Sequence, residues 1–211
     1  IAQIGFEGDV NETRGDFSTT AQRFSAGRSL AGIAAALDGT YAYRSGEKRF
    51  GVKARARVRQ AAVEPAALDA ALASLRAMAG TPLAPFGVAL ADAMRRASGT
   101  TKLDADIALA GTPARGGFRV SRLVAEGGGA EISWGGGTGI TYVWPAGLTR
   151  LDGRLTTDGG GLPQADIRLK QQRPGAPIEG LATIAPYQAG DARLALQPVR
   201  FVAAGGRTRF D

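Results

Sequence analysis

The chain of 211 residues is long enough for one large domain or two small ones, and its apolar fraction of 44% permits a hydrophobic core. It contains neither Cys nor His, which excludes disulfides, thiolate- or histidine-bearing metal sites, and Ser-His-Asp or Cys-His catalysis. The net charge of +7 is compatible with nucleic acid, an anionic membrane surface or an acidic glycolipid as partner, and equally with solubility alone.

Large side chains are scarce. Aromatic residues make up 7% of the chain, Gly contributes 31 residues, and much of the apolar content is Ala. This composition favours an extended sheet over a densely filled core. No apolar run approaches the ~20 residues of a membrane-spanning helix, and the chain begins at Ile1 rather than Met. We expect an internal segment of a longer protein, with any targeting or anchoring element outside it.

The first 63 residues read as strands joined by short turns. The segments "AQIGFEGDV" and "DFSTTAQRF" are rich in alternating, β-branched or aromatic residues. In "RSLAGIAAALDGTYAYR", the pair Asp38-Gly39 predicts a hairpin turn between two strands. The pattern is typical of an antiparallel meander.

Strict alternation of apolar and polar residues from Phe50 to Val58 predicts a half-buried strand. Its polar side carries Lys53, Arg55, Arg57 and Arg59. This basic row could be the solvated face of a strand, or it could bind anionic lipid headgroups or nucleic acid. Nucleic-acid readers usually place aromatic residues among the basic ones, whereas Phe50 lies on the other side, so we expect no nucleic-acid partner.

Residues 64–98 change to the helical period. Leu68, Leu72 and Leu75 form one apolar stripe after Pro65, and a second stripe follows the breaker "GTPLAP". We predict a helical hairpin, inserted between two runs of strands, that covers a sheet edge or the open side of a groove.

The strand pattern returns from residue 99 to the end. We predict roughly ten to thirteen strands in all, at the spacing typical of all-β folds. The glycine clusters "GGGAEISWGGGTG" and "TDGGGLP" have strands on both sides and no Gly-Lys-Ser/Thr ending, so they favour hairpin turns over a phosphate loop. Asp104 and Asp106 share one face of a strand, but nothing places a second carboxylate across a cleft from them. We therefore expect no catalytic residue, no metal and no cofactor.

Three stretches resemble a known family: "GTPLAPFGVALADAMRRASGTTKLDADIAL", "ITYVWPAGLTRLDGRLTTDGGGLPQADIRLKQ" and "LATIAPYQAGDARLALQPVRFVA". They look like the YdbH-type proteins of alphaproteobacteria, AsmA-like relatives of TamB that are sometimes labelled as dicarboxylate transport proteins. The resemblance covers about residues 64–211 and includes no catalytic motif.

The resemblance implies a periplasmic bridge with an inner-membrane anchor outside this segment. Its β-sheet would curl into an open groove with an apolar interior, which shields phospholipid acyl chains during transport between the inner and outer membranes. A small outer-membrane lipoprotein could pair with the full-length protein. The label of dicarboxylate transport has no support from a polar pocket or a membrane span in this sequence.

We therefore predict one continuous β-groove segment over residues 1–211: strands in 1–63, the helical hairpin in 64–98 and strands in 99–211. The candidate lipid-facing residues are the alternating apolar ones: Phe50, Val52, Val58, Leu103, Ile107, Leu109, Ile140, Tyr142, Trp144, Ile167 and Leu169. The candidate headgroup residues are Lys53, Arg55, Arg57 and Arg59. The alternative is a structural or protein-interaction β module of the cell envelope, without lipid binding. A third hypothesis is a glycan-acting enzyme that would need two facing carboxylates.

Overall fold

The structure is a computed structural model. It describes residues 2–5, 7–8, 11–26, 30–63, 101–189, 191–204 and 207–210, together with residues 69, 73, 88, 91–93, 95 and 96. The described part is mainly β, as the sequence predicts.

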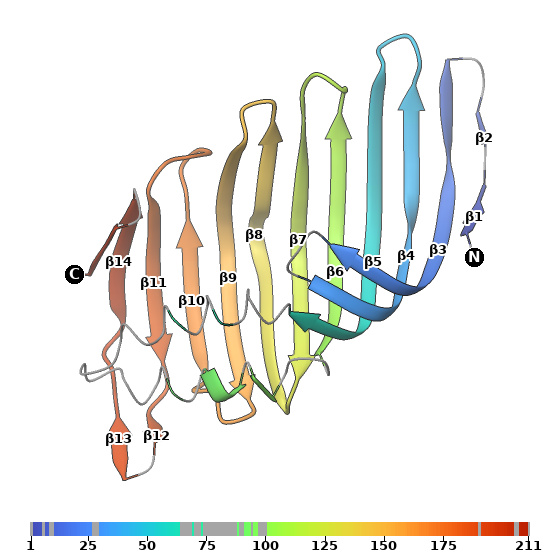
Figure 1. The fold of residues 1–211 in the computed structure, drawn as a ribbon. Coiled ribbons are helices and arrows are strands. Elements are labelled where there is room, and N and C mark those ends of the chain that lie inside the picture. Colours follow the sequence, from blue (N-terminus) through green and yellow to red (C-terminus); the bar gives the residue numbers. More distant parts are fainter. Residues whose placement is uncertain are drawn as a thin grey trace.

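One antiparallel sheet contains 13 of the strands, and it is not closed into a barrel (Figure 1). Its strands follow one another in chain order, except that β2 pairs with β3 and that β12 and β13 form a small sheet of their own. The bounds are β1 (Ala2–Ile4), β2 (Glu7–Gly8), β3 (Glu12–Ala26), β4 (Leu30–Arg44), β5 (Arg49–Val63), β6 (Thr101–Gly111), β7 (Gly116–Gly127), β8 (Ala130–Trp144), β9 (Leu148–Gly159), β10 (Ala165–Lys170), β11 (Ile178–Ile184), β12 (Tyr187–Ala189), β13 (Ala192–Leu194), β14 (Val199–Ala204) and β15 (Arg207–Phe210).

Short turns explain the meander topology. Residues 45–48 turn between β4 and β5, with Lys48 N donating to Ser45 O over 3.1 Å. Gly128 and Gly129 turn between β7 and β8, and Gly160 and Gly161 between β9 and β10, all with positive φ. Positive φ favours glycine, so these two glycine clusters do supply hairpin turns, as predicted.

Two expected turns are instead parts of strands. Asp38 and Gly39 lie inside β4, where they pair with Arg55 and Ala54 of β5. A Cβ on Gly39 would collide with the backbone of Lys53, so this glycine serves close strand approach rather than a turn. The cluster at 135–137 lies inside β8, where the register with β9 shifts between Gly135 and Gly139. It forms a bulge, not a hairpin.

Two bulges, one on β4 and one on β5, bend these long strands. Ala34 on β4 and Gln60 on β5 both have φ of 55°, and the register between these strands shifts at both positions. Beyond the two bulges, the ends of β3, β4 and β5 curve away from the direction of the other strands (Figure 1). Bulges bend the strand that carries them, so they give the sheet its corner.

The helical hairpin predicted for residues 64–98 is not supported. In this range the structure describes eight residues, all of them helical: Asp69, Ala73, Val88, 91–93, 95 and 96. The remaining residues of the predicted hairpin lie outside the described ones. Strands β5 and β6, which flank this range, pair directly with each other. The inserted residues therefore leave the sheet uninterrupted.

The described residues bury little apolar material. Among the residues whose burial is described, the buried hydrophobic ones are Ala61, Ala93, Trp134, Leu162 and Ala165, together with Pro163, and none of these side chains is less than 2% exposed. Trp134, Leu162 and Ala165 belong to the end of β8–β10 where Arg96 Nη2 donates to Gly160 O over 2.7 Å. A small core thus sits at this end, and most of the sheet has no comparable burial.

Candidate functional site

The register places every candidate lipid-facing residue on the same face of the sheet, which we call the apolar face. Directly opposed residues of an antiparallel pair point to the same side. Val52 opposes Leu109, Leu109 opposes Phe118, and Phe118 opposes Tyr142. One continuous row of apolar side chains therefore crosses β5, β6, β7 and β8.

A second row runs parallel to the first. Ile107 opposes Val120, and Val120 opposes Ile140, which in turn opposes Leu151 on β9. Nearer the other end of the strands, Val58 opposes Leu103. The rows together cover most of the length of the central strands.

Aromatic rings border the apolar face at the end where β5 and β7 begin. The rings of Phe50 and Trp144 are stacked, with centroids 6.3 Å apart and planes 4° apart. Gly111 on β6 and Gly116 on β7 occupy the register positions between them. Because these glycines have no side chains, the two rings can meet across two intervening strands. Trp144 Nε1 donates to Thr112 O over 3.3 Å.

The apolar face continues across the strands of the C-terminal half. Ile167 on β10 opposes Leu155 and Ala182, and Leu169 opposes Gly153 and Gly180. Phe201 on β14 opposes Gly180 and its ring lies where a Cβ of that glycine would stand. At the other side of the sheet, Tyr41 on β4 opposes Val52, so the face extends from β4 to β14.

The side chains of this face are half-buried rather than enclosed. Ten of the eleven candidates are of intermediate exposure, and Tyr142 is 41% exposed. An ordinary core would bury such residues almost fully. The apolar face therefore presents a wide surface that is still accessible from one side.

Several members of the apolar face are absent from the sequence-based list. Phe118, Val120, Leu123 and Trp134 belong to it by register. Val120 and Leu123 are three residues apart, yet both lie on this face because the register shifts between them. The period-two rule assigns them to opposite faces, so the bulge at Ser121 hides this part of the pattern. Trp134 is buried, and its Nε1 has no hydrogen-bond partner among the residues that the structure describes.

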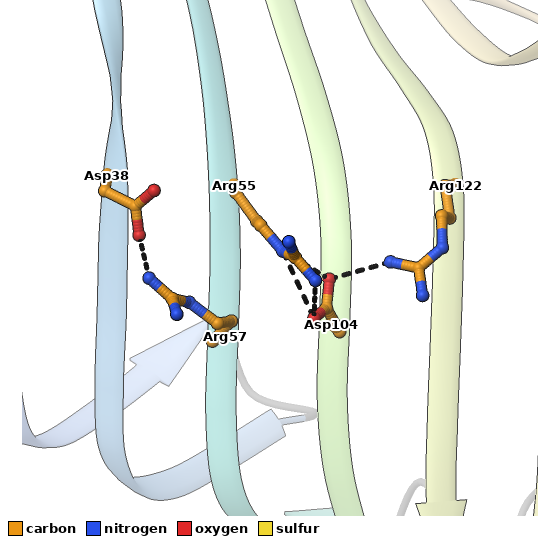
Figure 2. A network of polar contacts seen from close by, with 5 residues as sticks. All are labelled: Asp38, Arg55, Arg57, Asp104 and Arg122. Carbon is orange, nitrogen blue, oxygen red and sulfur yellow. Dashed lines mark hydrogen bonds and ion pairs between the residues drawn. The ribbon is translucent and has the colours of Figure 1, made fainter.

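The opposite, polar face carries a network of ion pairs (Figure 2). Arg55 on β5 donates from Nε and Nη2 to both carboxylate oxygens of Asp104 on β6, at 2.6–3.2 Å. Arg122 on β7 donates from Nη1 to Asp104 Oδ1 over 2.9 Å. Arg57 pairs in the other direction with Asp38 on β4. Strands β4–β7 are therefore linked by charge on this face.

The hydrogen bond from Arg55, followed by the charges of both arginines, holds the pKa of Asp104 below its usual range, although desolvation opposes the shift. The same carboxylate raises the pKa of Arg55. Two members of the predicted basic row, Arg55 and Arg57, are thus engaged within the sheet. The other two, Lys53 and Arg59, make no ion pair with any described residue.

Neither a metal cluster nor a membrane-spanning helix occurs in the described ranges. No three Asp or Glu side chains there are grouped to hold a metal ion, and no helix there has the length and apolarity needed to cross a membrane. The carboxylate of Asp104 faces Arg55 and Arg122 rather than a second carboxylate.

Comparison with models of known protein families, with curated proteins and with solved structures found no match for this chain.

Proposed function

We propose that this chain is a lipid-carrying segment, whose apolar face shields phospholipid acyl chains while the polar face contacts water. The observation that carries the proposal is the continuous apolar face from β4 to β14, whose large side chains are only half-buried. The proposed role requires no chemistry of bond formation or cleavage.

Physical chemistry supplies the driving force. Each CH2 group removed from water gains about 0.8 kcal/mol, so an acyl chain in the aqueous phase faces a barrier that grows with its length. An apolar sheet face that replaces membrane hydrocarbon removes most of that barrier. The small residues Ala54, Ala56 and Ala105, which alternate with larger ones along this face, leave room for a chain.

Sheet curvature favours the same role. The bulges at Ala34 and Gln60 turn the ends of β3–β5 out of line with the rest of the sheet. We propose that the sheet forms one wall of an open groove of the AsmA/TamB type. In a periplasmic bridge, an inner-membrane anchor outside this segment and an outer-membrane lipoprotein would complete the path.

Native mass spectrometry of the purified chain, with lipid extraction from the same sample, tests the proposal. We expect co-purified phospholipid, and we expect Ile107→Asp or Leu169→Asp to abolish it, because a carboxylate on the apolar face is costly to desolvate. Ala108→Asp is the matched control, since Ala108 follows Ile107 on β6 and opposes Lys53 and Arg119 on the polar face. Circular dichroism checks that all three variants fold.

A folded chain that carries no phospholipid and takes up no fluorescent fatty acid would overturn the proposal. The alternative of a structural or protein-interaction module of the cell envelope would then be favoured. Equal lipid content in Ile107→Asp and Ala108→Asp would likewise show that the apolar face is not the binding surface.

A further inference from the structure

A hollow of about 700 Å³ lies on the polar face over β9, β10, β11 and β14. Small-molecule sites commonly have volumes of about 300–1,000 Å³. Its charged lining consists of Arg154, Arg168, Lys170, Arg200, Asp152 and Glu179. The hollow is therefore lined by four cations and two carboxylates.

Three of these arginines lie in one row across the sheet. Arg154 opposes Arg168, Arg168 opposes Leu181, and Leu181 opposes Arg200. Neighbouring strands are about 4.8 Å apart, so Arg168 and Arg200 are separated by about 10 Å across Leu181. Long guanidinium side chains from both sides can reach a ligand seated over Leu181. Lys170 is two residues from Arg168 on the same face.

Arg154 is the one arginine of the lining with an ion pair among the described residues, and the carboxylate that it binds, Asp166, attracts Arg168 only through its charge. Arg154 donates from Nε to Asp166 Oδ1 over 2.7 Å and from Nη2 to Asp166 Oδ2 over 2.6 Å. Arg168, Lys170 and Arg200 make no ion pair with the residues that the structure describes. Like charges directly opposed on a sheet face are destabilising, so Arg154 and Arg168 favour an additional anion.

The two carboxylates of the lining, Asp152 and Glu179, leave a net positive charge over the hollow. Asp152 Oδ2 accepts from Thr138 N over 3.3 Å and from Thr138 Oγ1 over 3.1 Å, and lies 3.7 Å from Arg150 Nη2. It is thus committed to holding the bulge of β8. Glu179 opposes Lys170 without an ion pair in the described structure. Glu179 bounds the hollow and weakens its attraction for anions.

We infer that this hollow is a binding site for a phosphate-bearing anion, held by Arg168, Arg200 and Lys170. Guanidinium groups match phosphate oxygens in bidentate fashion, and a lysine adds a point charge. The ligand could be a soluble phosphate compound or the headgroup of an anionic phospholipid. This site lies on the face opposite the proposed acyl-chain surface and does not depend on that proposal.

Titration calorimetry with inorganic pyrophosphate, in about 150 mM salt where the Debye length is about 8 Å, tests the inference. We expect binding that Arg168→Gln or Arg200→Gln weakens about tenfold, since a hydrogen bond to a charged group is lost. Glu179→Gln should strengthen binding. Arg119→Gln is the matched control, because Arg119 is an exposed arginine of the same face, on β7, outside the hollow.

Vesicle flotation distinguishes a soluble phosphate compound from the headgroup of an anionic phospholipid. Vesicles of phosphatidylcholine alone are compared with vesicles that also contain phosphatidylglycerol. Pyrophosphate binding that depends on Arg168 supports a soluble ligand, and Arg168-dependent binding to phosphatidylglycerol vesicles alone supports a lipid headgroup. Absence of binding to both probes, or an equal loss in Arg119→Gln and Arg168→Gln, would overturn the inference.

Discussion

The indole ring of Trp144 on β8 lies over Gly116 of β7. A Cβ on this glycine would stand 2.7 Å from Trp144 Cε2 and closer still to Cζ2. The two residues are register partners. An aromatic ring over a cross-strand glycine is a known means of pinning the register of a sheet, and here it also brings Trp144 against Phe50.

Gly116→Ala should destabilise the protein by about 1–3 kcal/mol, the usual range for overpacking. The added methyl group would displace the indole ring, and with it the stack on Phe50 and the hydrogen bond to Thr112 O. Urea unfolding, followed by circular dichroism, measures the loss.

Gly51→Ala provides the matched control for this prediction. Apart from Gly51 and its two chain neighbours, no described residue places an atom within 4 Å of a Cβ built on Gly51. The substitution should therefore be neutral or slightly stabilising, because Ala reduces the freedom of the unfolded chain. An equal loss in both variants would show that the ring of Trp144 does not constrain Gly116.

Period-two alternation is the part of the sequence that predicted the structure well. Phe50, Val52 and Val58 fall on one face and Lys53 on the other, because an extended strand permits no other arrangement of successive side chains. Register then joins these residues to Leu109 and Tyr142 through strands whose own pattern is equally regular. The membership of the apolar face could therefore be predicted for regular strands.

The bulges and the place of Asp38-Gly39 could not be predicted, because the residue types at these positions do not indicate the structure that they adopt. Asp38-Gly39 has the chemistry of a turn, but its position inside β4 is set by pairing with β5. Ala34 and Gln60 have positive φ without being residues that favour it, so nothing in their identity marks the corner of the sheet. The bulge at Ser121 reverses the phase of β7, so alternation alone does not place Val120 and Leu123 on one face.

Lowering the pH should reduce the stability of the protein by protonating Asp104 and Asp166 on the polar face. Hydrogen bonds from Arg55 and Arg154, respectively, lower the pKa of each carboxyl from its ordinary value of 3.8. Such a carboxyl contributes its full stabilisation when the pH is above its pKa in the unfolded protein. This stabilisation is lost as the pH falls through its pKa in the folded protein. Stability should therefore decrease as the pH falls below about 4.

The double variant Asp104→Asn/Asp166→Asn tests this pH dependence. It should be less stable than the parent at neutral pH by about 0.5–1 kcal/mol per site, the upper range for partly exposed pairs. The difference should shrink as the pH approaches about 2, as measured by urea midpoints along a pH series. Asp16→Asn/Glu131→Gln removes two exposed carboxylates that have no ion pair with a described residue. If the two double variants show identical pH profiles, ion pairing on the polar face is not the cause.

Gln171 closes the end of β10 by bonding to two separate parts of the backbone. It is a buried polar residue, 5% exposed. Its Oε1 accepts from Leu151 N over 2.7 Å, and its Nε2 donates to Ala176 O over 2.6 Å. The side chain therefore ties β9 to the turn that leads into β11.

Gln171→Leu should cost about 2–4 kcal/mol, since Leu151 N and Ala176 O both lose their partner at a site with little access to water. Gln172→Leu, at the exposed neighbouring position, should change stability by less than about 0.5 kcal/mol.

Gln171→Glu tests the two hydrogen bonds separately. At neutral pH the introduced carboxylate can accept from Leu151 N but cannot donate to Ala176 O. Protonation restores a donor, so the deficit of this variant should shrink in acid, where the parent itself weakens. Urea unfolding of all three variants at neutral and acid pH measures the loss of stability relative to the parent. If the loss in Gln171→Glu does not depend on pH, Ala176 O is not the acceptor of the Gln171 side chain.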